Sequence, residues 1–366
     1  MTTSCKREQV LAFRVRAQQL DREQGTLADT SALDIGVQDT GPDAASWALA
    51  LRGVDVSGLP ASALVHLWTI RGAPHVYRRV DLPAVAAAVE PFSEADASKR
   101  IYDATKPLRA AGITTIDALD AIAATMRSVV MQPMVKGEVS ARLTDLMDPP
   151  YLRHCRPCDA THLYEMPFRL AAVRAGLELE AETSPPVLRR IADFDPASTA
   201  SPAHNVVRAY LRLLGPATPK HVADYLDAPV KDVKARWPAD SVEVSVDGEQ
   251  RWVLAADESA LAADPVRTTR LLGPFDLFLQ ARDRPLLVDD TARAKALWPV
   301  LGRPGAVLLD GEVAGTWRPR KAGKRLRVSV DLWTGDATAV RAAITQQAER
   351  LAAHRQVALA GVVFDG

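Results

Sequence analysis

Three consecutive polar residues near the N-terminus have types that could hold a water molecule for chemistry. In the stretch SALDIGVQDTGP, residues 31–42, Gln38, Asp39 and Thr40 come directly before a Gly-Pro pair. If the segment is extended, Gln38 and Thr40 face the same side, because side chains alternate along a strand. An amide and a hydroxyl could then orient one water, and an inward-turned carboxylate could act as a base. The tripeptide is therefore a candidate catalytic site.

A structural explanation of the same residues stays open. Residues 41–53 predict a helix, with a proline early in the helix and Gly53 where a helix stops. Thr40 could cap that helix, and Asp43 could complete a capping box. Asp39 would then simply be solvated, but Gln38 would have no explanation.

The elements that would position this tripeptide follow from the pattern of apolar residues around it. Leu33, Ile35 and Val37 alternate as in a short strand that leads into the tripeptide. The helix over 41–53 follows, and residues 60–80 predict a short helix that runs into a strand, a turn at Gly72 and a return strand.

The turn of that hairpin, in the stretch WTIRGAPH, carries a cation and an imidazole. Arg71 and His75 lie on either side of Gly-Ala-Pro. One hypothesis is a wing that presents Arg71 and His75 to DNA. The alternative is an ordinary hairpin whose arginine makes a surface ion pair.

A cluster of six cations near the C-terminus is the strongest candidate for nucleic-acid contact. The cluster decorates a predicted turn near Ala322-Gly323 and consists of Arg318, Arg320, Lys321, Lys324, Arg325 and Arg327. Unpaired cations must stay solvated or find anions. On a hairpin tip they could lie along phosphates or enter the minor groove. The alternative is an exposed strand edge that its charges protect from aggregation.

The stretch HCRPCDATH, residues 154–162, has part of a zinc-binding pattern. Cys155 and Cys158 have the spacing of a zinc knuckle, and His162 follows. A structural zinc site usually has a second pair of ligands, and Cys5 is the only other cysteine. His154 and an acidic residue could complete four ligands in a cramped arrangement. We expect buried thiols, with His162 hydrogen-bonded in the core, and therefore no metal and no cofactor.

The clearest structural unit lies at residues 201–262. Three helical segments, NVVRAYLRLLG, TPKHVADYLDA and PVKDVKARWP, precede two alternating strands that meet at Asp247-Gly248. Three helices followed by a β-hairpin predict a winged helix, a relative of the helix-turn-helix modules that enter the major groove.

The same order of elements recurs more weakly upstream. We expect winged-helix-like regions at 1–110, which holds the candidate catalytic tripeptide, and at 111–200. Residues 263–366 predict a β-rich domain with a hairpin at Asp310-Gly311, the basic hairpin and a closing helix over 337–353. The expected fold class is α+β, with tandem winged helices and a C-terminal β-rich domain.

Composition narrows the function classes. The 366 residues include 45 Lys+Arg and 45 Asp+Glu, so the chain as a whole is not basic and any DNA-binding charge must be local. Charges interrupt the N-terminal stretch where a signal peptide needs an apolar core, and no apolar run is long enough to span a membrane. Three cysteines form no disulfide framework. We expect a cytoplasmic, nucleoid-associated monomer.

Several stretches together resemble the AlkZ-like winged-helix DNA glycosylases over nearly the whole chain. They are IGVQDTGPDAASWALALR, LVHLWTIRGAPHVY, HCRPCDATHLYEMPFRLAAVRAGLEL, LLGPFDLFLQARDR and LLDGEVAGTWRPRK. The resemblance implies tandem winged helices that bind double-stranded DNA and excise alkylated bases or unhook crosslinks. The family signature is Gln, an apolar residue, then Gln or Asp. Gln38 matches its first position, whereas Asp39 and Thr40 depart from the other two.

Two functions follow as hypotheses. The first is a monofunctional DNA glycosylase that hydrolyses the N-glycosidic bond of N7- or N3-alkylated purines, including bulky adducts or crosslinks. In it, Gln38 and Thr40 hold the water and Asp39 is the second choice. The second is a non-catalytic winged-helix DNA-binding protein, either a transcription regulator or a damage-recognition protein.

Overall fold

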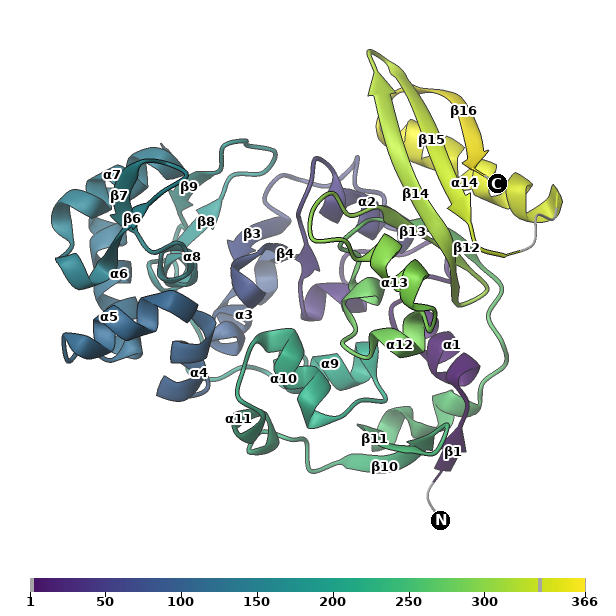
Figure 1. Cartoon of the computed structure of the whole chain (residues 1–366), viewed down its shortest axis with the longest axis horizontal. Coiled ribbons are helices and arrows are strands. Elements are labelled where there is room, and N and C mark those ends of the chain that lie inside the picture. The colour runs from purple at the N-terminus through teal and green to yellow at the C-terminus, as the bar shows by residue number, and fades with distance from the viewer. Residues whose placement is uncertain (1–2, 335–337, 366) are drawn as a thin grey trace.

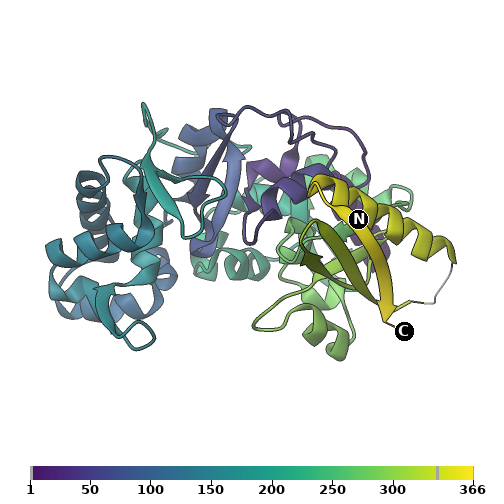
Figure 2. The ribbon, with the colours of Figure 1, turned by 90° about the horizontal axis from the view of Figure 1, so that it is seen from above.

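The structure is a computed structural model that describes residues 3–334 and 338–365. It contains helices and four separate β-sheets, so the predicted α+β class is confirmed. Figure 2 shows the second region (residues 111–200) and the C-terminal sheet at opposite ends of the molecule, with strands β3 (Leu64–Trp68) and β4 (Pro74–Arg78) between them. Within the described residues, no helix combines the length and the apolar character needed to cross a bilayer.

A winged helix forms where residues 201–262 predict one. Its elements are α9 (Val206–Leu214), α10 (Pro219–Leu226), α11 (Val230–Lys234), β10 (Ser241–Val246) and β11 (Glu249–Leu254). The turn between the strands uses positive φ angles at Asp247 (48°) and Gly248 (86°), as an Asp-Gly hairpin requires. An N-terminal strand, β1 (Thr3–Cys5), adds to β10 in parallel, and η6 (Ala255–Ala262) follows β11.

A six-stranded sheet joins the first and second regions. Its order is β2 (Val37–Gln38), β4 (Pro74–Arg78), β3 (Leu64–Trp68), β8 (Leu177–Leu179), β9 (Val187–Arg190) and β5 (Met134–Val135). The two halves meet where His66 of β3 pairs with Leu179 of β8. Each half is a three-stranded unit, and the candidate tripeptide begins in the edge strand β2.

The first region differs from the expected pattern in two places: residues 61–63 form a turn and not the expected short helix before β3, and the strand expected before the tripeptide is largely replaced. Its helical elements are α1 (Arg7–Ala17), η1 (Ser31–Asp34), α2 (Ala44–Leu51), η2 (Ile70–Gly72), η3 (Arg79–Asp81), α3 (Leu82–Val89), α4 (Glu94–Arg100), η4 (Tyr102–Ala104) and α5 (Thr105–Ala110). The expected strand through Leu33 and Ile35 is wrong, because a 3-10 turn occupies Ser31–Asp34 and the strand has only two residues. Leu33 and Ile35 are nevertheless buried, so the alternating apolar residues indicated burial and not an extended backbone.

The second region also follows a winged-helix order of elements. Its helices are α6 (Thr115–Val129), α7 (Lys136–Leu146) and α8 (Glu165–Arg174), and β5, β8 and β9 form its sheet. A separate two-stranded hairpin, β6 (Leu152–Cys155) and β7 (Ala160–Leu163), lies between α7 and α8, after η5 (Pro149–Tyr151).

The C-terminal region is a five-stranded sheet with helices beside it. Its elements are β12 (Thr269–Leu272), η7 (Leu277–Gln280), α12 (Arg284–Leu287), α13 (Thr291–Leu297), β13 (Gly305–Leu309), β14 (Glu312–Ala322), β15 (Arg325–Leu332), α14 (Thr338–His354) and β16 (Ala358–Asp365). Both predicted hairpins form. The closing helix forms too, although Ala337 of its predicted range lies outside the described residues. The strand β16, which pairs with β15 in parallel, was not predicted.

The hydrophobic core does not divide into four parts. One continuous cluster of buried apolar side chains includes residues of α1, α2, α9, α10, β12 and β13. The second region has its own cluster around α6 and α8. The four predicted domain limits stay a prediction, and packing couples the first, third and fourth regions closely.

Candidate active site

An extended backbone carries the candidate tripeptide along the edge of the six-stranded sheet. In the register of β2 and β4, Val37 pairs with Val76 and Gln38 pairs with His75. The Asp39 N–H continues this pairing by donating a hydrogen bond to the Pro74 carbonyl over 2.8 Å. Alternating side chains therefore place Asp39 on the face opposite its two neighbours.

Gln38 and Thr40 lie together on one face. The Gln38 Nε2 donates a hydrogen bond to the Thr40 Oγ1 over 3.0 Å, and both residues are half-buried. Among the described residues, the Gln38 Oε1 has no hydrogen-bond partner, although it is shielded from solvent. A buried acceptor without a partner can bind a hydrogen of a water or a substrate.

Asp39 turns to the first turn of α2 and to β3. Its Oδ1 accepts a hydrogen bond from the Ala45 N–H over 3.1 Å, and its Oδ2 lies 3.2 Å from His66 Nδ1. The Asp39 and His66 side chains keep 23% and 19% of their exposure. A carboxylate at a helix N-terminus is stabilised by unpaired N–H groups and the helix dipole.

This arrangement corrects the predicted helix cap. The residue at the N-cap position of α2 is Asp43, and no side chain at that position accepts a capping hydrogen bond. The N–H of Ala45 is satisfied by Asp39, six residues earlier in the chain, and not by Thr40. Thr40 is therefore free to contact Gln38, and Asp39 is not merely solvated.

Contacts with the C-terminal sheet hold α2 in place. The indole N–H of Trp47 donates to the Leu271 carbonyl over 2.8 Å. Near the end of α2, Arg52 makes two hydrogen bonds to the Asp276 carboxylate, at 2.9 and 3.0 Å, and both side chains are buried. Residues of the stretch LLGPFD thus fix the helix that follows the tripeptide.

The long helix α14 also meets the start of α2. Ser46 Oγ lies 3.1 Å from His354 Nε2, and Arg355 pairs with Asp43 over 2.6 Å. Burial lowers the pKa of His354 below its ordinary value. The beginning of α2 is therefore held from two elements of the C-terminal region.

The structure corrects the expectation that Arg71 and His75 are presented to DNA. His75 is 1% exposed and its Nδ1 lies 2.9 Å from the Ala73 carbonyl. Burial lowers its pKa to about 3, so the ring is neutral at pH 7. Arg71, which has a φ of 57°, reaches inward to the Tyr225 carbonyl and to Gln280. Its guanidinium also lies 4.8 Å from the centre of the Tyr225 ring, so it ties the hairpin to α10.

The basic hairpin presents its cations to solvent. All six of its cationic residues are exposed, and within the described part of the chain no carboxylate forms an ion pair with any of them. Arg320 and Arg327 are directly opposite in the register of β14 and β15. Figure 1 shows the two strands reaching beyond the rest of their sheet. Like charges in a cross-strand pair repel unless an anion lies between them.

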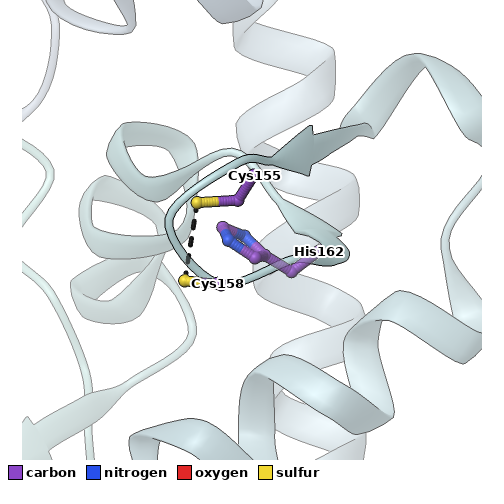
Figure 3. Close-up of side chains that lie close together, drawn as sticks. All are labelled: Cys155, Cys158 and His162. Atoms are coloured by element: carbon purple, nitrogen blue, oxygen red, sulfur yellow. Dashed lines mark hydrogen bonds between the residues drawn. The ribbon is translucent and has the colours of Figure 1, made fainter.

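The sulfur atoms of the Cys-Arg-Pro-Cys stretch are not in the core, contrary to expectation. Cys155 is half-buried and Cys158 is exposed. Their Sγ atoms lie 3.5 Å apart, next to the ring of His162 (Figure 3). The neighbouring His162 side chain lowers the pKa of Cys155 to about 7. These residues belong to the β6–β7 hairpin and lie apart from the tripeptide in the sequence and in the fold.

His66 is the residue at the tripeptide that the sequence did not single out. It lies 27 positions from Asp39, and nothing in its local pattern connects the two. Its place follows from the sheet register, in which Val37, Val76 and His66 share one row and therefore one face.

Comparison with known proteins identifies the family of the chain. The model of the DNA glycosylase AlkZ-like family matches residues 27–354. Among solved structures, the DNA glycosylase AlkZ of Streptomyces sahachiroi has a similar fold, with a TM-score of 0.74 and 21% sequence identity. That similarity covers 100% of both chains. No curated protein sequence matches the chain.

Proposed function

The chain belongs to the AlkZ-like DNA glycosylase family, and from that membership we propose that it hydrolyses the N-glycosidic bond of N7- or N3-alkylated purines in duplex DNA. Membership supports a repair enzyme that acts on DNA. The class of adduct and the identity of the catalytic groups are our proposal, and they rest on the site around Gln38.

The chemistry of such a lesion sets modest demands on the protein. A purine alkylated at N7 or N3 carries positive charge and leaves as a neutral base when the bond to C1′ breaks. The sugar passes through an oxocarbenium-like state, and a water oxygen then bonds to C1′ while its proton goes to solvent. Strong protonation of the leaving group is unnecessary, so polar neutral groups that hold the water suffice.

The observation that carries the assignment is the unpartnered Gln38 Oε1 beside the Gln38–Thr40 hydrogen bond. The amide oxygen can accept one hydrogen of the water, and the Thr40 hydroxyl can contact it from the same face. Orienting a nucleophile in this way is a recognised source of rate enhancement. We therefore propose Gln38 and Thr40 as the catalytic pair.

Asp39 is the second choice for the base. Its carboxylate is half-exposed and could accept a proton or stabilise a cationic sugar. Both of its oxygens, however, already contact Ala45 and His66. These contacts favour a positioning role, in which Asp39 fixes the backbone between Gln38 and Thr40.

We also propose that the basic hairpin binds the phosphates of duplex DNA. Its six cations are exposed and free of ion pairs within the described residues, and a phosphate between Arg320 and Arg327 would relieve the repulsion of this cross-strand pair. The enzyme would act as a monomer in the cytoplasm, associated with the nucleoid.

An alkaline-cleavage assay tests the activity. Duplexes with a single N7-methylguanine, N3-methyladenine or bulky N7 adduct are incubated with excess enzyme and then heated in alkali, which breaks the strand at abasic sites. We expect strand breaks only after the alkali step, and no covalent complex on reduction with borohydride, because the enzyme is monofunctional. Strand breaks no more frequent than in the same duplexes heated in alkali without enzyme would overturn the proposal.

The departures of Asp39 and Thr40 from the family signature favour one alternative, a non-catalytic DNA-binding protein. In the same assay such a protein leaves every adduct intact. It would instead bind one unmodified sequence, or damaged duplex, far more tightly than random DNA.

A further inference from the structure

The hairpin β6–β7 brings two thiols and an imidazole to one point, far from the tripeptide in sequence. Cys155 ends β6, Cys158 lies in the turn, and His162 lies on β7. The ligand atoms of the three side chains all lie within 4.8 Å of one another. Figure 3 shows the imidazole between the two sulfur atoms and the returning strand.

The distance between the two sulfur atoms matches that of two thiolates bound to one metal ion. Zinc bound by two thiolates at about 2.3 Å in a tetrahedron places the sulfur atoms about 3.8 Å apart. The two Sγ atoms lie at 3.5 Å, which is well beyond the roughly 2 Å of a disulfide bond. Both side chains have solvent access, so an ion can enter the site.

His162 is oriented as a metal ligand. Its Nδ1 lies 2.7 Å from the Leu163 carbonyl, to which it donates its proton. The Nε2 then carries the free lone pair. Metal-binding histidines characteristically donate their other ring N–H to a carbonyl or carboxylate, which fixes the tautomer and the ring orientation.

The turn between the cysteines has the backbone of a metal-binding knuckle. The Cys158 N–H donates to the Cys155 carbonyl over 3.2 Å, and Asp159 adopts a positive φ of 46° directly after the second cysteine. This tight turn returns the chain so that both sulfur atoms point to the same side.

We propose that Cys155, Cys158 and His162 bind one Zn²⁺ ion. The site uses two thiolates and one imidazole, the ligand types that zinc prefers, and the thiol protons go to solvent on binding. This proposal replaces our expectation of a metal-free hairpin. It is independent of the proposed glycosylase activity.

The register of the hairpin excludes His154 from the ligand set. Arg153 pairs with His162 and Cys155 pairs with Ala160, so these residues share one face. His154 pairs with Thr161 on the other face, where its Nε2 lies 3.7 Å from Asp159. Among the described residues, the group of close ligand atoms at this hairpin consists of Cys155, Cys158 and His162, so the fourth ligand in our proposal is a water molecule.

A zinc ion here would fix the hairpin against the second region. The hairpin has only four residues in each strand, and an isolated two-stranded hairpin is marginally stable in water. It packs on α7 through β7. Binding of the ion to the folded protein alone raises the stability of the protein.

Metal analysis of the full chain tests the proposal. The protein is purified with a phosphine reductant, loaded with Zn²⁺ and desalted, and its zinc content is measured by mass spectrometry. Co²⁺ is titrated separately, because a thiolate–cobalt charge-transfer band reports sulfur ligation directly. We expect one metal ion per chain, thiolate bands with Co²⁺, and a lower Tm after chelation.

Variants distinguish the ligands from their neighbours. Cys158→Ser and His162→Ala should each weaken zinc binding by a factor of about 100 or more and remove or shift the cobalt bands. His154→Ala, on the other face of the same hairpin, and Cys5→Ala, at the buried third cysteine, should retain one zinc. Circular dichroism without metal confirms that each variant is folded.

Four outcomes would overturn the proposal. The first is no zinc retained by the folded wild-type chain, and the second is equal zinc affinity in wild type and Cys158→Ser. The third is an intact mass that shows a Cys155–Cys158 disulfide even when reductant and Zn²⁺ are present. Loss of zinc in His154→Ala as large as that in His162→Ala would equally refute the three-residue ligand set.

Discussion

The side-chain amide of Gln38 donates a hydrogen bond to the Thr40 hydroxyl over 3.0 Å, across Asp39, whose carboxylate projects from the opposite face of the chain. The relationship has a simple cause. The tripeptide continues an edge strand, so its first and third side chains share one face and its second side chain takes the other. The two faces thus have different partners and, in our proposal, different tasks.

Replacing Gln38 should remove base excision without removing DNA binding. In Gln38→Ala the water loses its acceptor, and we expect the single-turnover cleavage rate of an N7-alkylguanine duplex to fall by a factor of about 100 or more, at unchanged affinity. Gln250→Ala, an exposed amide on the wing hairpin, is the matched control and should cleave normally. An unaltered rate in Gln38→Ala would refute the assignment.

Replacing Asp39 should reveal how much of its role is structural. Asp39→Ala removes the acceptor for the Ala45 N–H and should lower the free energy of unfolding by about 1 kcal/mol. Asp39→Asn keeps an oxygen at the same place and should recover most of that loss. Urea denaturation checks both variants. If Asp39→Asn is as stable as wild type but loses cleavage, the carboxylate is the base and the pair Gln38–Thr40 is not sufficient.

Removing two cations of the basic hairpin should weaken binding to every duplex equally. For Lys321→Ala combined with Arg325→Ala, we expect lower affinity and a dependence of log K on log salt that is flatter by about 2. The matched control removes two cations that already have acidic partners, Arg142 and Lys220. Fluorescence anisotropy across a salt series measures both. An unchanged slope would show that the hairpin does not contact DNA.

The buried pair of Arg52 and Asp276 should dominate the attachment of α2 to the C-terminal region. Asp276→Ala leaves a buried guanidinium without its carboxylate and should lower the free energy of unfolding by about 3 to 5 kcal/mol. Glu138→Ala, at an exposed pair, should cost less than about 1 kcal/mol. Guanidinium denaturation compares them. A similar loss for the two variants would mean that the buried pair does not hold the helix.

The free energy of unfolding should decrease at acid pH because His75 must take up a proton on unfolding. Its folded pKa is about 3, below the ordinary value of 6.5, because burial disfavours the charged ring. The unfolded chain therefore binds more protons between these values, so stability is complete above about pH 6.5 and declines toward pH 3, by up to about 1.4 kcal/mol per pH unit. The variant His75→Gln should have a flatter profile in thermal or urea unfolding from pH 7 to 5.

The variant His75→Gln should still lose some stability in acid, because burial also lowers the pKa of His221 and His354. A profile for His75→Gln that matches wild type over the whole range would contradict the assignment of His75. Measuring duplex binding by His75→Gln then separates a buried structural histidine from a DNA contact, since the variant should bind duplex normally.

Local sequence was sufficient wherever the conformation depends on neighbouring residues. The pairs Asp247-Gly248 and Asp310-Gly311 fold as tight hairpins because aspartate and glycine accept positive φ angles more readily than other residues do. The helix of residues 206–214 follows from apolar side chains at helical spacing. The winged helix at 201–262 was predictable because its first helix and its hairpin each follow from a local pattern of residues.

The same local signals gave wrong predictions where contacts with distant residues determine the conformation or the burial of a side chain. Leu33 and Ile35 alternate as in a strand, yet they enter the core from a 3-10 turn, since alternation records burial and not backbone angles. Arg71 and His75 looked like surface groups of a turn. Packing of α10 against that turn gives the arginine a partner 154 positions away and leaves the histidine no contact with solvent.

For this protein the sequence by itself determined the family, the helices, the tight turns and the three side chains of the tripeptide. Only the tertiary structure decided that Asp39 faces α2 and His66, that Gln38 faces Thr40, and that two thiols meet His162 on an exposed hairpin. The physical reason is the range of the interactions. Backbone preferences act over a few residues, whereas sheet register and core packing join residues tens or hundreds of positions apart.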